Sequence, residues 1–157
     1  MAWSIGWDCY AVNAMRTIVY VETSVPSFYH EVRAEPEMVA ELVTSAAVID
    51  ELERGEYPSR RQCLDLLGGL PLLAIELAVI DIVDAYIARQ VMPANPAGDA
   101  LHLALASFHR CDFLVTWNCR HLANATKFGH IRRVNTLLGL FVPTLVTLLE
   151  LLQGENR

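Results

Sequence analysis

The sequence predicts a three-layer α/β domain in which a central, mainly parallel sheet of four to five strands is flanked by helices. Short β-branched and apolar runs alternate along the chain with longer stretches of helical periodicity, which is typical of βαβ units. The 157 residues suit one compact domain, and a hydrophobic content of 54% indicates a large core. We expect this domain to span residues 15–157. Residues 1–14 lack sustained periodicity and are expected to be a loose extension or a misassigned start before Met15.

Periodicity gives the elements of the first half of the chain, and capping and turn residues give their ends. They are, in chain order, a strand over 17–21, a strand over 42–44, a helix from the N-cap Ser45 to Glu53, and a helix over 59–67. Gly55 ends the first of these helices, and the pair Gly68-Gly69 ends the second.

The second half of the chain is expected to continue the alternation of strands and helices. Its elements are a strand over 72–75, a helix over 76–91, a helix over 97–109, a strand over 112–116, a short helix over 120–126, an edge strand over 131–134 and a closing helix over 145–151. The helix over 97–109 is apolar on nearly every face and should therefore lie inside the molecule. Asn95-Pro96 resembles its N-cap and first position.

Charge and cysteine content exclude several classes of protein. The formal net charge of −6 lacks the basic footprint of a passive RNA or DNA coat, although it does not exclude a nuclease with a carboxylate site. The four cysteines form no CxxC pair and no zinc-ligand spacing, which favours small buried hydrophobes in a reducing compartment. Without a signal peptide pattern or a run of about 20 apolar residues, we expect a cytoplasmic protein with no membrane segment.

Four polar residues stand where one edge of a parallel sheet could gather them. Glu22 and Asn118 follow predicted strands, Glu51 lies in the helix after the second strand, and Asp99 opens the apolar helix. Carboxylates are the ligands that Mg²⁺ and Mn²⁺ prefer, and such an ion can activate a water for attack on phosphate. Each residue alone has another reading. Asp99 could complement a helix dipole, Glu51 could belong to a solvated face, and Glu22 could be a turn residue.

The segment GDALHLALASFHRCDFLVTWNCRHLANATK resembles the second half of a PIN domain, in the branch related to VapC-type toxins. The signature of that branch is a DALH helix followed by a TWN-x-x-HLAN turn. Three further segments resemble its first strand with an acid-Thr-Ser signature, its second strand with an acidic helix, and its loop before the third acidic position. They are IVYVETSVPSFY, VTSAAVIDELERGEYP and VMPANPAGDA, so that the resemblance runs from about Met15 to Leu151.

The resemblance implies a divalent-metal-dependent endoribonuclease that hydrolyses RNA, and the toxin of a type II toxin–antitoxin pair is one setting for it. Mg²⁺ or Mn²⁺ would be the cofactor, with a homodimer and a small antitoxin as partners. The implied catalytic residues are Glu22, Glu51, Asp99 and Asn118, of which the three acids would bind the metal. Supporting roles fall to Thr23, Thr116 and His121, and weak RNA contacts to Arg120, Lys127 and Arg132.

Glu22, Asn118, a shortened segment and the acidic net charge support a second hypothesis, a weakened or inactive PIN scaffold that binds a protein or RNA. Glu22 replaces the usual Asp and moves the carboxylate about 1.5 Å further from the backbone. The segment between Ser24 and Val43 is shorter than in this branch, with only the 18 residues 25–42. An unrelated nucleotide-binding enzyme is disfavoured because no GxGxxG or GxxxxGK[ST] motif follows a strand. His102 lies on the same helical face as Asp99, where either a hydrogen-bonded core histidine or a neighbour of the site fits.

Overall fold

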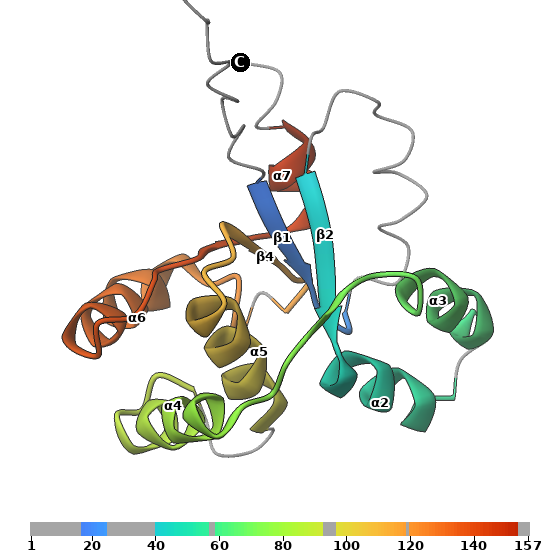
Figure 1. Ribbon diagram of the computed structural model, residues 1–157. Coiled ribbons are helices and arrows are strands. Elements are labelled where there is room, and N and C mark those ends of the chain that lie inside the picture. Colours follow the sequence, from blue (N-terminus) through green and yellow to red (C-terminus); the bar gives the residue numbers. More distant parts are fainter. Residues whose placement is uncertain (1–16, 25–39, 57–58, 93–96, 119, 154–157) are drawn as a thin grey trace, which may run out of the picture.

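The chain folds as an α/β domain around a five-stranded, all-parallel sheet with the strand order β3-β2-β1-β4-β5 (Figure 1). The structure is a computed structural model and describes residues 17–24, 40–56, 59–92, 97–118 and 120–153. The predicted fold class is confirmed, and two helix pairs, α4 with α5 and α2 with α3, flank the strands. The predicted extension over 1–14, Met15 and Asn95-Pro96 lie outside the described residues.

The elements have the following bounds. The strands are β1 Thr17–Val21, β2 Ala40–Ser45, β3 Leu72–Leu73, β4 Phe113–Val115 and β5 Thr144–Val146. The described helices are α2 Ala46–Arg54, α3 Arg60–Leu67, α4 Leu77–Ala88, α5 Ala97–Phe108, α6 Ala125–Leu137 and α7 Leu148–Gln153.

Local chemistry explains the boundaries that the site depends on. β-branched residues favour the extended chain of β1, whose last three residues are buried. Ser45 ends β2 and caps α2, since its side chain accepts a hydrogen bond from the backbone N–H of Val48. A strand thus passes into a helix with no intervening loop, and this junction fixes where Glu51 emerges one and a half turns later.

The core lies around α5 and the central strands, as the apolar composition of α5 predicts. Its residues from Ala100 to Ser107, apart from the half-buried Leu101, are buried almost completely. Cys63 and Cys111 are also buried, and burial raises the pKa of the Cys111 thiol to about 12. That thiol therefore remains protonated and packs as a small hydrophobe, which agrees with the reading of these two cysteines as core residues.

The region after residue 119 differs from the sequence prediction. Ile131–Val134 is not an edge strand, because it lies inside α6, where Ile131, Val134 and Asn135 are buried at helical spacing and Asn124 provides the N-cap. The short helix predicted over 120–126 is a turn that leads into α6. The closing helix predicted over 145–151 begins at Leu148, because the preceding residues form β5 beside β4.

None of the helices in the described part of the chain is long and apolar enough to cross a lipid bilayer. The two apolar helices α4 and α5 have twelve residues each.

A candidate acidic site at the carboxyl edge of the sheet

The register of the sheet brings the ends of the strands together. Val21 of β1 is level with Val115 of β4, which is level with Val146 of β5. Because all strands are parallel, the residues that follow them emerge at the same edge. Glu22 and Thr116 are therefore neighbours, and the Glu22 N–H donates to the Val115 carbonyl at 3.5 Å.

Glu22 folds back onto the turn that follows β1. Its carboxylate accepts hydrogen bonds from the backbone N–H of Ser24, at 3.1 Å, and from the Ser24 hydroxyl. The same Ser24 Oγ lies 3.3 Å from Thr116 Oγ1 and accepts from the Trp117 N–H at 2.7 Å. The Glu22 side chain is only 4% exposed, and its longer reach is used to close this turn rather than to project into solvent.

Asn118 joins the end of β4 to the start of α5. Its Nδ2 donates to both carboxylate oxygens of Asp99 at 3.0 Å, and its own N–H donates to Thr116 Oγ1 at 2.9 Å. The amide orientation is fixed, because Asn118 Oδ1 accepts from the backbone N–H groups of Arg120 and His121. An amide donor, rather than a carboxylate, therefore faces the Asp99 carboxylate.

Glu51 reaches the same edge from α2 and is held by two side chains. The hydroxyl of Thr23 donates to Glu51 Oε2, and His102 Nε2 lies 3.2 Å from the same oxygen. His102 is buried in α5, and its Nδ1 lies 2.8 Å from the Tyr20 hydroxyl, which in turn lies 2.8 Å from Ser45 Oγ. The two readings of His102 thus hold together: it is a hydrogen-bonded core histidine that contacts the site.

The charge state of Glu51 follows from these contacts. Burial by itself would raise the pKa of this carboxyl group. The hydrogen bond and electrostatic interaction with His102, the Thr23 hydroxyl and the Arg54 guanidinium outweigh burial and hold the pKa below its usual value. Glu51 is therefore a carboxylate at neutral pH. Burial raises the pKa of the Tyr20 phenol, which contacts the other nitrogen of His102, well above its usual value.

Gly98 permits the close approach of Glu51 to the start of α5. A Cβ atom at this position would lie 2.7 Å from Glu51 Oε1, closer than non-bonded atoms can pack. Asp99 follows in the first turn of the same helix and is 8% exposed. Glu51 and Asp99 therefore both lie at the N-terminal end of α5, where the helix dipole favours negative charge.

The structure brings the four predicted residues into one place. A chain of hydrogen bonds and close polar contacts runs from Glu22 through Ser24, Thr116 and Asn118 to Asp99. Glu51 joins this chain through Thr23, which lies between Glu22 and Ser24 in sequence. The Thr23 hydroxyl contacts Glu51, and the Thr116 hydroxyl contacts Ser24 and the Asn118 N–H.

The remaining predicted residues lie on the turn and helix that follow Asn118. His121 is half-buried, and its Nδ1 has no hydrogen-bond partner among the described residues. Arg120 is exposed in the turn, and Lys127 and Arg132 lie on α6, half-buried and exposed respectively.

Sequence reasoning missed Ser24, Tyr20 and Gly98 as parts of the site. Ser24 bridges Glu22 and Thr116, which are far apart in the chain, so only the sheet register reveals its role. Tyr20 lies inside a predicted strand. Only its position on the inner face of that strand indicated that its hydroxyl would be buried. The signal for Gly98 was available, since a glycine directly before an acid that opens a helix indicates a close approach.

The carboxylates of this site suit a hard divalent cation only if waters and a substrate phosphate supply the other ligands. Within the described ranges, no three His, Cys, Asp or Glu side chains gather closely enough to hold an ion by themselves. Mg²⁺, however, usually keeps several waters and binds through one or two carboxylates together with substrate phosphates. Glu22 and Glu51 each retain one carboxylate oxygen that accepts no hydrogen bond from the part of the chain that the structure describes. The residues fit this open mode of binding.

Comparison of the chain with family models, curated proteins and solved structures finds no match.

Proposed function

We propose that the protein is a PIN-type endoribonuclease that hydrolyses RNA with Mg²⁺ or Mn²⁺ as cofactor. The observation that carries the proposal is the set of hydrogen bonds and close polar contacts that joins Glu22, Asn118 and Asp99 at the carboxyl edge of a parallel sheet. Glu51 is bonded to Thr23, which follows Glu22 in the chain. Acids from three separate elements converge there, and this is the part of such a sheet where ligands bind. The motif resemblance supports the same activity.

The residues of the chain would divide the work as follows. Asp99, Glu51 and Glu22 would hold the ion directly or through water, and the ion would activate a water and neutralise charge on the phosphate. Asn118 holds the Asp99 carboxylate from one side, which leaves its other side for a ligand. Thr23 and His102 fix the rotamer of Glu51, and Ser24 fixes that of Glu22.

The proposal includes protein partners. Exposed apolar side chains gather along β3 and the start of α4, namely Leu72, Ile75, Leu77 and Ile80. An exposed apolar surface of this kind supports a protein–protein contact. A second copy of the chain and a small antitoxin are the partners that we propose for a cytoplasmic toxin of this type.

The test is the Asp99→Asn variant, assayed on a mixed RNA pool in Mn²⁺ with the wild type alongside. Loss of the carboxylate should reduce metal-dependent cleavage by at least about 100-fold. The matched control is Asp84→Asn, which removes an exposed acid from α4 and should cleave at the wild-type rate. Circular dichroism checks that both variants fold. Full activity in Asp99→Asn would reject the mechanism.

A second function, a non-catalytic PIN scaffold that binds RNA or protein, is favoured by one observation. Asn118 presents an amide donor to Asp99, and the described residues contain no preassembled group of three metal-ligating side chains. Calorimetric titration with Mn²⁺ separates the two proposals. Binding that Asp99→Asn abolishes supports the nuclease, whereas a folded wild type that binds no Mn²⁺ supports the scaffold.

A further inference from the structure

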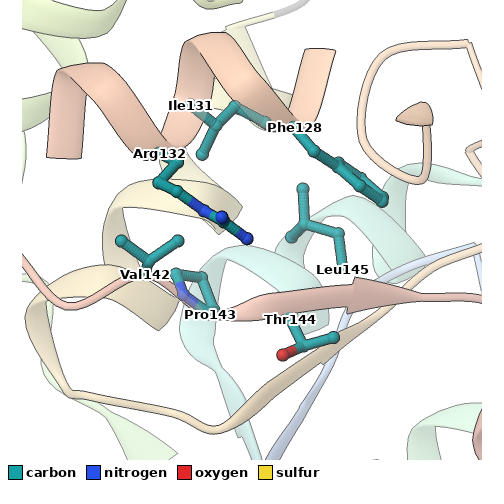
Figure 2. A pocket seen from close by; sticks show the side chains of 7 residues that line it. All are labelled: Phe128, Ile131, Arg132, Val142, Pro143, Thr144 and Leu145. Atoms are coloured by element: carbon teal, nitrogen blue, oxygen red, sulfur yellow. The ribbon is translucent and has the colours of Figure 1, made fainter. Parts of the chain in front are cut away.

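A hollow lies between α6 and the segment that leads into β5, apart from the acidic network (Figure 2). It is lined by Phe128, Ile131, Arg132, Val142, Pro143, Thr144 and Leu145 and has a volume of about 200 Å³. Small-molecule sites typically measure about 300–1,000 Å³, so this hollow suits one planar group rather than a whole ligand or a peptide helix.

The walls of the hollow combine an aromatic ring, aliphatic side chains and a cation. Figure 2 shows the Phe128 ring at one end, and the Arg132 side chain extending from α6 into the space above Pro143 and Thr144. Phe128 is 36% exposed, so part of its ring is accessible at the surface. An aromatic ring and a guanidinium group that line one hollow form a combination on which single-stranded nucleic acids can stack their bases and pair their phosphates.

The charge of α6 favours an anionic ligand. The helix carries Lys127, Arg132 and Arg133 and has no Asp or Glu between Ala125 and Leu137, although the whole chain has a net charge of −6. Among the described residues, the Arg132 guanidinium takes part in no ion pair or hydrogen bond. A cation that no neighbouring acid neutralises is available to a phosphate group.

The hollow is also tied to the acidic network through the backbone. The N–H groups of Leu122 and Ala123 donate to the Asn118 carbonyl, and the Asn124 side chain donates to the Arg120 carbonyl. Asn124 then caps α6, and Phe128 follows about one helical turn into that helix. The start of α6, which carries Phe128, is therefore tied to the backbone of Asn118.

We propose that the hollow binds one base of a single-stranded RNA, with the base stacked on Phe128 and an adjacent phosphate paired with Arg132. The inference rests on the proposed function for the choice of RNA, and it adds a binding site outside the acidic network. A protein segment with apolar and acidic side chains could also pack on Phe128 and pair with Arg132. The small volume favours a single base, because a protein segment needs a longer groove.

The experiment measures RNA binding without cleavage. Fluorescence anisotropy with labelled decauridylate in EDTA compares the wild type with Phe128→Ala, Phe128→Leu and Arg132→Ala. A second probe of the same length carries abasic ribose, which keeps the phosphates and removes the bases. Leu137→Ala, an exposed apolar residue at the far end of α6, and Arg61→Ala, an exposed arginine of α3, are the matched controls.

Phe128→Ala should weaken binding of decauridylate by about 5- to 100-fold and leave binding of the abasic probe unchanged. Phe128→Leu, which keeps an apolar side chain but has no ring, should show most of the same loss. Arg132→Ala should weaken binding of both probes and reduce the salt dependence by about 0.7 in the slope of log affinity against log salt. Both controls should bind like the wild type.

The outcomes separate this inference from the proposed function. The inference is overturned if Phe128→Ala binds decauridylate like the wild type, if it loses both probes equally, or if the wild type binds no RNA. It stands without the nuclease if the Phe128 variants behave as expected while wild-type protein in Mn²⁺ cleaves nothing. Conversely, cleavage by the wild type together with unchanged binding by Phe128→Ala supports the nuclease alone.

Discussion

Two buried polar networks lie in this domain, and they differ in how completely their hydrogen-bond donors and acceptors are paired. The first joins Tyr86 of α4, Ser107 of α5 and Asn135 of α6. The Tyr86 hydroxyl donates to Asn135 Oδ1 at 2.7 Å and lies 3.1 Å from Ser107 Oγ, while Asn135 Nδ2 lies within hydrogen-bond distance of Ser107 Oγ and the Phe141 carbonyl. This ring is neutral, and its members use each other's donors and acceptors.

The second network, at the carboxyl edge of the sheet, contains three carboxylates and no lysine or arginine bonded to them in the described residues. Two of its acceptor oxygens, on Glu22 and Glu51, are left over. The difference teaches that buried polarity serves two purposes in this fold. A closed neutral ring fixes helices against one another, whereas the open acidic network keeps unpaired carboxylate oxygens, which the metal ion that we propose would occupy.

The largest expected effect breaks the closed ring. Asn135→Ala removes the shorter of the two hydrogen bonds of the Tyr86 hydroxyl, which keeps only Ser107, and takes the Asn135 donor from the Phe141 carbonyl. An unsatisfied buried group costs about 1–3 kcal/mol. We expect the free energy of unfolding in urea to fall by about 3 kcal/mol, while Mn²⁺ affinity of the folded protein is unchanged. A loss of stability no larger than that of an exposed substitution such as Thr126→Ala would contradict the role given to the ring.

The second effect comes from the titration of Tyr86. Burial raises the pKa of this phenol to about 12, above its ordinary value of 10.0. Folding therefore favours the neutral phenol, so its stabilising contribution is complete below pH 10 and is lost as the pH rises towards 12. Relative to Tyr86→Phe, the wild type should lose about 1.4 kcal/mol of unfolding free energy per pH unit in this window. If the unfolding free energies of the wild type and Tyr86→Phe depended on pH in the same way, the raised pKa of Tyr86 would be contradicted.

A smaller effect comes from adding a charge to the open network. Asn118→Asp replaces the amide that donates to Asp99 by a second carboxylate, and the two charges repel each other. In EDTA we expect a loss of about 1–2 kcal/mol of unfolding free energy, which millimolar Mn²⁺ restores. The double variant with Asp99→Asn should be insensitive to Mn²⁺. Equal destabilisation with and without the ion would show that the edge does not attract cations.

The smallest effect on stability should come from Glu22→Gln. The amide oxygen of glutamine can still accept from Ser24, and the oxygen that it replaces by NH₂ accepts no hydrogen bond among the described residues. The free energy of unfolding should therefore change by less than about 0.5 kcal/mol, whereas the Mn²⁺ dissociation constant should rise by about tenfold or more. A variant that unfolds much more easily would show that Glu22 is a structural residue of the turn.

Much of the fold could be read from local signals, and the errors have local causes. Ser45 predicted both the end of β2 and the start of α2, because N-capping depends only on one residue and its near neighbours in the sequence. β5 was missed because three residues after Pro143 are too few to show an alternating pattern. Ile131 and Val134 suggested a strand by their side chains, although their spacing equally fits the buried face of α6.

The sequence predicted where the site lies in the fold, but not how its side chains bond to one another. Glu22, Thr116 and Asn118 could be placed at one edge because parallel strands end together. The bond between the Asn118 amide and Asp99 depends on side-chain rotamers and on the backbone donors of Arg120 and His121, which no spacing in the sequence reveals. The role of Ser24 likewise depends on a contact across the sheet with Thr116.

The strand order has a further consequence for the protein during its synthesis. β1 lies between β2 and β4, so one edge of β1 stays unpaired until β4 has been synthesised much later. About 100 residues separate Glu22 from Asn118, which at roughly 5–20 residues per second corresponds to about 5–20 s of translation. Throughout that interval the nascent chain already carries Glu22 but not the side chain that holds Asp99. The nuclease that we propose would therefore have an incomplete acidic site until Asn118 has been translated.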